Sequence, residues 1–352
     1  MIDQVAIQNF RGIRHVELDN VQRICLVSGK NNVGKSTLLE AIFLLMDHTA
    51  NESFSKVNGF RGAFLGDSTA MWDSFFYGLD STEKIVLSVV EGANRSTLTY
   101  RKDTAYVPVS DGIVSDDVLA QFRAATRSSY SLGFSYVENG YEESGHFSIS
   151  SGSMLRQMNT SLPGGEIKAM RPTRFLTASI SRSLEPVADG IGRLELSGEK
   201  PMIVSVLQKM DPAIEDIVTV SVQGISQLHV RARGQWIPIQ LSGDGVMRLL
   251  QICLAILEHR DGLVLVDEIE SGLHYSTYGA LWRAVEEMSR RTGTQVIATT
   301  HSYEMIAAAR ESIEDADCFS YFRLGKTAED VRAHRFSLTM LGDALDSEME
   351  VR

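Results

Sequence analysis

One glycine-rich octapeptide constrains this chain more than any other feature. It fits the pattern G-x-x-x-x-G-K-[ST], in the order Gly29, Lys30, Asn31, Asn32, Val33, Gly34, Lys35, Ser36. An apolar, β-branched run at 23–28 precedes it, and a helix-forming run at 37–46 follows it. A strand, a glycine loop and a helix in this order bring backbone N–H groups and a helix N-terminus to phosphate oxygens. The stretch is therefore predicted to bind a nucleoside triphosphate, with Lys35 at the β- and γ-phosphates and Ser36 on Mg²⁺.

A second signal comes from two acids at the end of an apolar run. The run 263–266 is Leu-Val-Leu-Val, and Asp267 and Glu268 follow it. Ligands of open α/β sheets bind at the carboxyl ends of strands. We therefore expect Asp267 to hold Mg²⁺ through water beside Ser36, and Glu268 to polarise an attacking water. The alternative is a solvated pair of acids that closes an ordinary strand, and the phosphate loop in the same chain disfavours it.

Composition limits the class of protein. The 352 residues predict roughly two domains, or one large α/β unit with an insertion. A net charge of −11 argues against a chain coated with basic surface for nucleic acid, and it leaves room for a local basic patch. Cys25, Cys253 and Cys318 each lie in an apolar run, so they are expected to be buried thiols of a protein in a reducing cytoplasm. No signal-peptide pattern and no apolar run of membrane-spanning length is present.

Periodicity predicts a mixed α/β chain without heptads or repeats. Helices are predicted at 69–77, 116–126, 200–211, 245–259 and 275–291. Strands are predicted at 2–9, 13–18, 84–90, 96–101, 105–109, 134–137, 146–149, 174–180, 217–222, 228–233, 236–239, 262–266, 295–298, 318–324 and 331–336. The stretch 151–200 gives the weakest pattern.

Four further motifs occur in an order that resembles a known family. They are Asn9-Phe10-Arg11-Gly12, Leu241-Ser242-Gly243-Asp244-Gly245, Glu270-Ser271-Gly272-Leu273-His274 and Thr299-Thr300-His301-Ser302. The last three resemble the signature loop, the D-loop and the switch histidine of ABC-type ATPases in the OLD/RecF/SMC-like group, and the first resembles the group's N-terminal F-[RK]-[GS] motif. The chain looks most like the stand-alone AAA15/AAA21 ATPases, many of which belong to anti-phage defence operons.

The resemblance implies a fold class and a division of the chain. The fold would be an α/β ABC-type ATPase head, with a mixed central sheet, an antiparallel β-subdomain and a mixed α/β insertion, and with no long coiled coil. Residues 1–110 would form lobe I, 111–198 an insertion that binds a partner, and 199–352 lobe II.

The resemblance also assigns roles to residues. Lys35, Glu268 and His301 would be catalytic, with His301 sensing the γ-phosphate and the attacking water. Ser36 and Asp267 would hold Mg²⁺. Residues 29–37, including Thr37, would bind ATP, together with Arg11 and the signature residues Ser242, Gly243, Asp244 and Gly245. Ser242 and Gly243 would contact the γ-phosphate of ATP held by the other protomer, with Ser271 at the seam of a homodimer or larger homo-oligomer.

Missing features narrow the function. No heptad run typical of the coiled coil of SMC proteins is found, and residues 302–352, which follow His301, are expected to complete the ATPase sheet and not to form a Toprim nuclease domain. Asp315 and Asp317 imitate a Toprim D-x-D but read better as polar residues before a strand. No glutamine is assigned to a Q-loop, since Gln121 and Gln157 lie in unsuitable contexts.

The resemblance, together with these missing features, implies an ATP-hydrolysing sensor or scaffold for a separately encoded nuclease or toxin in a bacterial anti-phage defence system. A RecF-like DNA-binding repair ATPase is the alternative, and a transporter subunit is a third interpretation. The basic pairs Arg171/Arg174, Arg231/Arg233 and Arg290/Arg291 are interpreted as solvated faces rather than as a DNA site. No membrane partner is expected.

Overall fold

The computed structural model describes most of the chain. The described residues are 1–48, 53–61, 72–103, 131–150, 153–159, 171–179, 185–222, 225–327, 330–347 and 349–352. The predicted strand 105–109, the predicted helix 116–126 and part of the predicted helix 69–77 lie outside these ranges.

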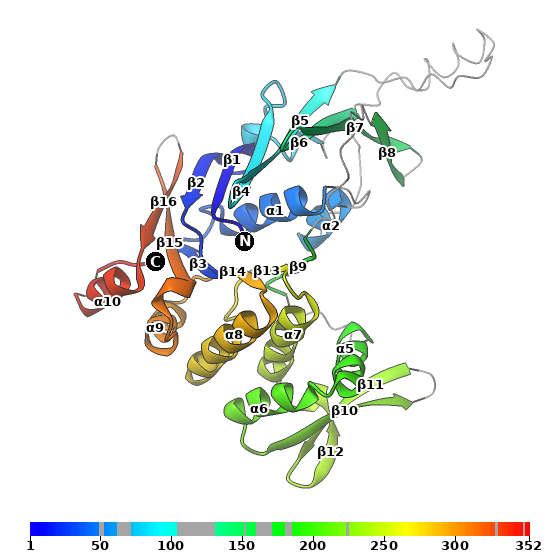
Figure 1. Ribbon diagram of the computed structural model, residues 1–352, viewed down its shortest axis with the longest axis vertical. Helices are drawn as coiled ribbons and strands as arrows, with labels where there is room; N and C mark the ends of the chain where they lie inside the picture. Colours follow the sequence, from blue (N-terminus) through cyan, green and yellow to red (C-terminus); the bar gives the residue numbers. More distant parts are fainter. Residues whose placement is uncertain are drawn as a thin grey trace, which may run out of the picture.

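A six-stranded sheet crosses the middle of the molecule (Figure 1). Its order is β16–β15–β3–β14–β13–β9, and all neighbours are parallel except the edge pair β15–β16. The strands are β3 (Ile24–Gly29), β9 (Thr173–Leu176), β13 (Leu263–Val266), β14 (Gln295–Thr299), β15 (Phe319–Lys326) and β16 (Val331–Phe336). The parallel register places the carboxyl ends of β3, β13 and β14 at one edge, where the predicted site residues follow.

Both faces of this sheet are covered, which explains its uninterrupted apolar runs. Ile24 and Leu26 of β3 belong to one hydrophobic core, and Cys25 and Val27 belong to the other. The same alternation holds in β13, where Val264 and Val266 face the first core and Leu263 and Leu265 the second. Because side chains alternate along a strand, one apolar run stabilises two layers.

On one face, helix α1 (Lys35–Met46) lies between the central sheet and a second, antiparallel sheet (Figure 1). Of its residues, only Ser36 is not buried, as expected for a helix with a layer on each side. The antiparallel sheet has the order β2–β1–β4–β5–β6–β7–β8. Its strands are β1 (Gln4–Phe10), β2 (Ile13–Asp19), β4 (Ile85–Glu91), β5 (Asn94–Asp103), β6 (Ser131–Glu138), β7 (Tyr141–Ser150) and β8 (Ser153–Asn159), with α2 (Ser53–Phe60) beside α1.

Helices α7 (Asp244–Glu258), α8 (Tyr278–Thr292) and α9 (Tyr303–Ser312) lie on the other face (Figure 1). Below them lie α5 (Glu185–Ser197), α6 (Lys200–Met210) and a three-stranded antiparallel sheet. That sheet consists of β10 (Ile214–Val222), β11 (Ile225–Ala232) and β12 (Gln235–Pro238). Helix α10 (Leu338–Asp346) packs on β15 and β16, and short 3₁₀ turns η1 to η4 occupy Tyr77–Leu79, Ile239–Leu241, Tyr275–Thr277 and Ala316–Cys318.

The predicted region 111–198 contributes to all three parts of the molecule. Strands β6 to β8 extend the antiparallel sheet, β9 joins the central sheet, and α5 packs against β10, β11 and α7. β9 ends at Leu176, four residues before the predicted strand end at residue 180. Helix α5 was not predicted, since Gly190 and Gly192 lower its intrinsic helix propensity. Packing explains Gly190: a Cβ there would lie 3.0 Å from Glu258 Oε1 and 3.2 Å from a Leu254 methyl of α7.

Helix lengths bear on the predicted absence of a coiled coil. Within the described ranges the longest helices, α7 and α8, have 15 residues each. None of the described helices is long and apolar enough to span a membrane.

The three cysteines are free thiols. Cys25 and Cys253 are buried, and Cys318 is half-buried. Burial raises the pKa of Cys25 and Cys253 to about 12.

Candidate functional site

The phosphate loop has the backbone geometry that its glycines permit. Gly34 begins α1 in the left-handed region at φ 109°, and Asn32 adopts φ 63°. Gly29 has φ 146°, and a Cβ there would lie 2.6 Å from the carbonyl oxygen of Leu324. Only glycine is compatible with that close approach of two strands.

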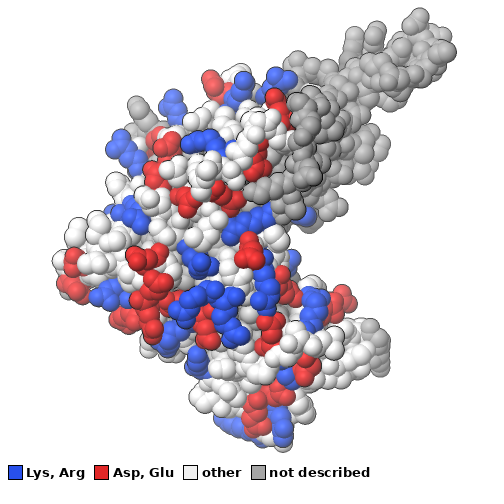
Figure 2. All heavy atoms as spheres, in the orientation of Figure 1, with Lys and Arg blue, Asp and Glu red and all other residues white. Residues whose placement is uncertain are grey.

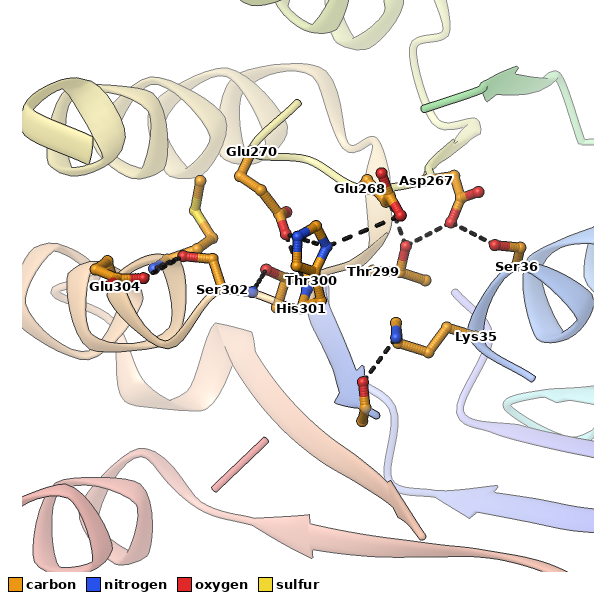
Figure 3. Close-up of polar contacts among 12 residues, drawn as sticks. Lys35, Ser36, Asp267, Glu268, Glu270, Thr299, Thr300, His301, Ser302 and Glu304 are labelled. Atoms are coloured by element: carbon orange, nitrogen blue, oxygen red, sulfur yellow. Dashed lines mark hydrogen bonds and ion pairs between the residues drawn. The ribbon is translucent and has the colours of Figure 1, made fainter. Parts of the chain in front are cut away.

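Lys35 lies folded back over this loop (Figure 3). Its Nζ donates to the carbonyl oxygens of Gly29, at 2.7 Å, and Lys30, at 3.2 Å. Burial lowers the pKa of Lys35, while the carboxylates of Glu268, Asp267 and Glu270 act in the opposite direction. The ammonium group is thus held where phosphate oxygens would replace its carbonyl partners.

Three segments meet at the Asp267 carboxylate (Figure 3). Ser36 Oγ of α1 donates to Asp267 Oδ1 at 3.0 Å, and Thr299 Oγ1 at the end of β14 donates to the same oxygen at 2.6 Å. Thr299 Oγ1 also accepts the backbone N–H of Glu268 at 2.8 Å. The structure therefore brings Ser36 and Asp267 together, and it adds Thr299, whose role the sequence did not indicate.

This oxygen set suits Mg²⁺ held in part by a triphosphate. Mg²⁺ keeps several waters and takes few protein ligands, commonly one or two oxygens besides phosphate oxygens. Ser36 Oγ and Asp267 Oδ1 supply such a pair. The described part of the chain has no group of three or more His, Cys, Asp or Glu residues that could hold a metal without such help.

Glu268 and His301 face one another across the same edge, with Glu270 behind the histidine (Figure 3). His301 Nδ1 lies 3.1 Å from Glu270 Oε1 and 3.8 Å from Glu268 Oε1. Glu270 Oε1 also accepts the backbone N–H of His301 at 2.8 Å. The Glu270 side chain is only 7% exposed, whereas those of Glu268 and His301 are 41% and 50% exposed. Glu270 is therefore a buried anchor, and Glu268 is free to meet a ligand.

Glu268 also has an unusual backbone. Its φ of 47° is in the left-handed region, which costs a non-glycine residue energy. The turn directs the chain away from β13 immediately after Asp267, so that Asp267 and Glu268 have different surroundings. Such strained residues are typical of functional sites.

These residues line an open cavity of about 590 Å³. Thr177, Ala178 and Ser179, which follow β9, form one wall, and Phe60, Arg61 and Phe175 form another. Thr177 and Ser179 bring hydroxyl groups to the cavity lining. Asn31, Asn32, Gly34, Lys35, Ser36, Thr37, Glu40, Asp267, Glu268 and His301 complete the lining.

Arg11 lies outside that lining. Its guanidinium donates to Glu40 Oε2 at 2.7 Å and to Asn58 Oδ1 at 2.8 Å, and burial lowers the pKa of Arg11 to about 10. Arg61 donates to the other Glu40 oxygen at 2.7 Å and to Thr37 Oγ1 at 3.0 Å. The arginine in the cavity wall is therefore Arg61, which the sequence did not single out because it lies in an irregular segment far from the motifs.

The signature residues Ser242, Gly243, Asp244 and Gly245 are also absent from the cavity lining of their own chain. They open α7 beside the D-loop, where a Cβ on Gly245 would lie 3.0 Å from the carbonyl oxygen of Gly272. Ser242 Oγ is buried and has no hydrogen-bond partner among the described residues. Leu241, just before it, is 74% exposed.

Comparisons with known proteins identify a family and several relatives of this chain. A family model described as "AAA domain, putative AbiEii toxin, Type IV TA system" (AAA_21) matches residues 25–307. A Helicobacter pylori protein named "ATP/GTP phosphatase" is 23% identical over 334 residues, which are 90% of each chain. An uncharacterized Methanocaldococcus jannaschii protein, MJECL10, is 47% identical over 55 residues, 16% of this chain and 24% of the relative.

A solved structure gives the fold. The "SmcHead bound to the C-winged helix domain of ScpA" superposes with a TM-score of 0.52 at 12% identity, covering 98% of this chain and 99% of that one. At this identity the likeness concerns the fold alone, and that fold is the SMC-head type of ABC ATPase. The predicted fold class, α/β with a mixed central sheet and antiparallel strands, is confirmed.

Proposed function

The chain belongs to the AAA_21 family of AAA domains, and from that premise we propose that it binds ATP with Mg²⁺ and hydrolyses it. The observation that carries the proposal is the meeting of Ser36, Asp267 and Thr299 beside the phosphate loop, in a cavity that also presents Glu268 and His301. These are the groups that phosphoryl transfer to water requires: a phosphate cradle, a metal seat and a residue that positions water.

In the proposed mechanism, the backbone N–H groups of the loop and the N-terminus of α1 bind the phosphates, and Lys35 exchanges its carbonyl partners for phosphate oxygens. Ser36 and Asp267 would hold Mg²⁺, which would neutralise negative charge on the phosphates. Glu268 polarises the attacking water. His301, whose Nδ1 donates to Glu270, would offer Nε2 as an acceptor to the attacking water beside the γ-phosphate.

We further propose that two copies enclose the nucleotide. The signature residues lie outside the cavity of their own chain, and Ser242 Oγ lacks a partner within the described residues. The γ-phosphate of ATP held by a second copy would be such a partner. It would accept hydrogen bonds from Ser242 and from the N-terminus of α7. Hydrolysis would then depend on an ATP-linked homodimer or larger homo-oligomer.

The biological role that we propose is a sensor or scaffold for a separately encoded effector, a nuclease or toxin, in bacterial anti-phage defence. The family description, which names a putative toxin of type IV toxin–antitoxin systems, supports a role in a multi-gene system. Figure 2 shows basic and acidic side chains interspersed over the visible face, which does not favour a surface devoted to nucleic acid.

The test is the mass of the Glu268→Gln protein with and without ATP and Mg²⁺, alone and with the product of the neighbouring gene. We expect an ATP-dependent doubling of mass or more, because the variant binds ATP and hydrolyses it roughly a hundredfold more slowly. Lys35→Ala should abolish both ATP binding and the mass change. Lys84 is an exposed lysine just before β4, and the control variant Lys84→Ala should change neither. An unchanged mass together with salt-dependent DNA binding would replace this proposal with the repair function.

A further inference from the structure

One buried arginine touches all three segments that the proposed cycle requires. Arg248 lies in α7, in the second turn after the signature residues, and it is 1% exposed. Its Nη1 donates to the carbonyl oxygen of Thr177 at 2.7 Å. Its Nη2 donates to the carbonyl oxygen of Asp267 at 2.7 Å and to that of Glu268 at 3.2 Å.

Burying the positive charge of Arg248 costs desolvation free energy, so its retention in the core points to a role beyond packing. Burial lowers the pKa of Arg248 to about 10, while Asp267, Glu270 and Glu268 favour its charged form. The guanidinium is protonated at neutral pH. Its Nε has no hydrogen-bond partner among the described atoms. A buried cation that leaves one donor unpaired is not the arrangement that packing alone would favour, since an apolar side chain could fill the same volume.

The three carbonyl groups belong to segments that line the nucleotide cavity. Thr177 begins the 177–179 wall of the cavity, and Asp267 and Glu268 carry the carboxylates proposed to face Mg²⁺ and water. Arg248 itself is rigidly joined to the N-terminus of α7, where Ser242 and Gly243 lie. A planar guanidinium fork holds acceptors at fixed angles, which a flexible ammonium group does not.

We propose that Arg248 is a positioning residue that couples the occupied nucleotide cavity to the orientation of the signature helix. ATP and Mg²⁺ fix the Asp267–Glu268 turn and the 177–179 wall, and Arg248 transmits that placement to α7. The start of α7 then takes the orientation that fits the γ-phosphate of the second copy. This inference rests on the proposed ATPase function and adds the connection between its two half-sites.

The test compares Arg248→Lys and Arg248→Met with Arg193→Met. Arg193 is the control because it binds the same helix at its far end, through Glu258, and is 61% exposed. Each protein is measured for thermal unfolding, for ATP affinity by calorimetry and for kcat. ATP-dependent dimerisation is measured in the Glu268→Gln background.

We expect both Arg248 variants to bind ATP within about threefold of wild type, since no Arg248 atom lies at the phosphate loop. We expect kcat and the dimerisation affinity to fall roughly 10- to 100-fold in Arg248→Met, and less in Arg248→Lys, which keeps the charge but not the fork. Arg193→Met should match wild type. A split between affinity and kcat is the readout that a purely structural role would not produce.

Three results would overturn the inference. Wild-type kcat and dimerisation in Arg248→Lys and Arg248→Met would show that no coupling passes through the guanidinium. A parallel loss of ATP affinity and kcat in Arg248→Lys, or its failure to fold, would make Arg248 a structural support of the cavity. If the unsubstituted protein itself neither bound nor hydrolysed ATP, the proposed function would fail first, and this outcome is separate from the other two.

Discussion

Glu270 offers a sharp test at the scale of single residues. One of its oxygens accepts the backbone N–H of His301 and also lies at 3.1 Å from Nδ1, so it fixes both the position and the tautomer of the ring. We expect Glu270→Ala to lower kcat roughly 10- to 100-fold while ATP affinity stays within about threefold, because the ring would lose its orientation but the phosphate loop would not. Steady-state kinetics and calorimetry measure the two quantities.

Glu304 is the matched control for Glu270. It is an exposed acid three residues after His301, and it contacts Ser302 at the start of α9. Glu304→Gln should leave kcat within a factor of about two, as a surface substitution would. Equal losses of kcat in the Glu270 and Glu304 variants would mean that negative charge near His301, and not the contact between Glu270 and the ring, controls the rate.

The lowered pKa of His259 leads to a prediction of how the stability of the folded state depends on pH. Burial at the end of α7 lowers its pKa below 6.5, although Nδ1 donates to the carbonyl oxygen of Ala255 at 2.9 Å. The folded state thus binds a proton less readily than the unfolded state. Stability should fall as pH drops through about 6.5, where the unfolded histidine gains its proton first, and the loss should be complete below the folded pKa. His259→Gln should lose less thermal stability between pH 7 and 5 than wild type does, and an identical loss would contradict the assignment.

Sequence reasoning at this scale succeeded where residues act through local spacing. Ser36 and Asp267 were predicted to meet, and they do so at 3.0 Å. The sequence did not reveal the contacts of four residues, because each contacts a partner that only the tertiary fold brings near. They are Glu270, Thr299, Arg61 and Arg248. Arg248 and Thr177, for example, are 71 residues apart. A lone arginine in an apolar helix carries no mark of the carbonyl groups it will meet.

At the scale of elements, the Glu40 carboxylate connects α1 to the β1–β2 turn and to the end of α2. This carboxylate of α1 is 2% exposed, and it binds Arg11 from the β1–β2 turn and Arg61 from the end of α2. Glu40→Ala would leave the buried Arg11 guanidinium with Asn58 Oδ1, at 2.8 Å, as its remaining hydrogen-bond acceptor among the described residues. We expect a loss of about 3 kcal/mol in unfolding free energy, as for other buried ion pairs that lose one member.

Urea unfolding measures this loss, with Glu17→Ala as the control. Glu17 pairs with His15 at 3.4 Å on the surface, and it is 57% exposed. Its removal should cost about 0.5 kcal/mol or less. A Glu40→Ala protein as stable as the Glu17→Ala protein would show that the buried network contributes little and that solvent reaches Arg11.

Elements with strong periodicity were predictable, and those that depend on packing were not. Helices α6, α7 and α8 and the strands of the central sheet appear within a few residues of their predicted ranges. Helix α9 was not predicted, although Ser302 caps it by accepting the N–H of Met305 at 3.1 Å. Its run of three alanines is neither strongly apolar nor periodic, so its burial against α8 is visible only in the fold.

At the scale of the whole molecule, the order of motifs along the chain indicated the architecture, because several of them flank elements of the central layers. The phosphate loop joins β3 to α1, the signature residues open α7, and Thr299 ends β14. The sequence could not show that the described strands of 111–198 divide between two sheets while α5 packs on a third, since strand pairing depends on partners far away in the chain. The resemblance implied that the signature residues act on ATP of the other protomer, and in the structure they lie outside the cavity of their own chain. That separation is the strongest argument that a complete site needs two copies.

A mixing experiment tests whether the site is shared. Lys35→Ala removes the phosphate-loop lysine, and Ser242→Arg places a bulky side chain where the second copy's γ-phosphate would lie. Each variant alone should be inactive. In an equal mixture, half of the dimers pair the two variants, and in each of these one site combines an intact Lys35 with an intact Ser242. The mixture should therefore recover about a quarter of the wild-type rate if the sites work independently. No recovery, after subunit exchange has been verified by mass, would mean that the two sites must hydrolyse ATP together. Substantial activity of Ser242→Arg alone would decide for the single chain, because that variant leaves its own cavity intact.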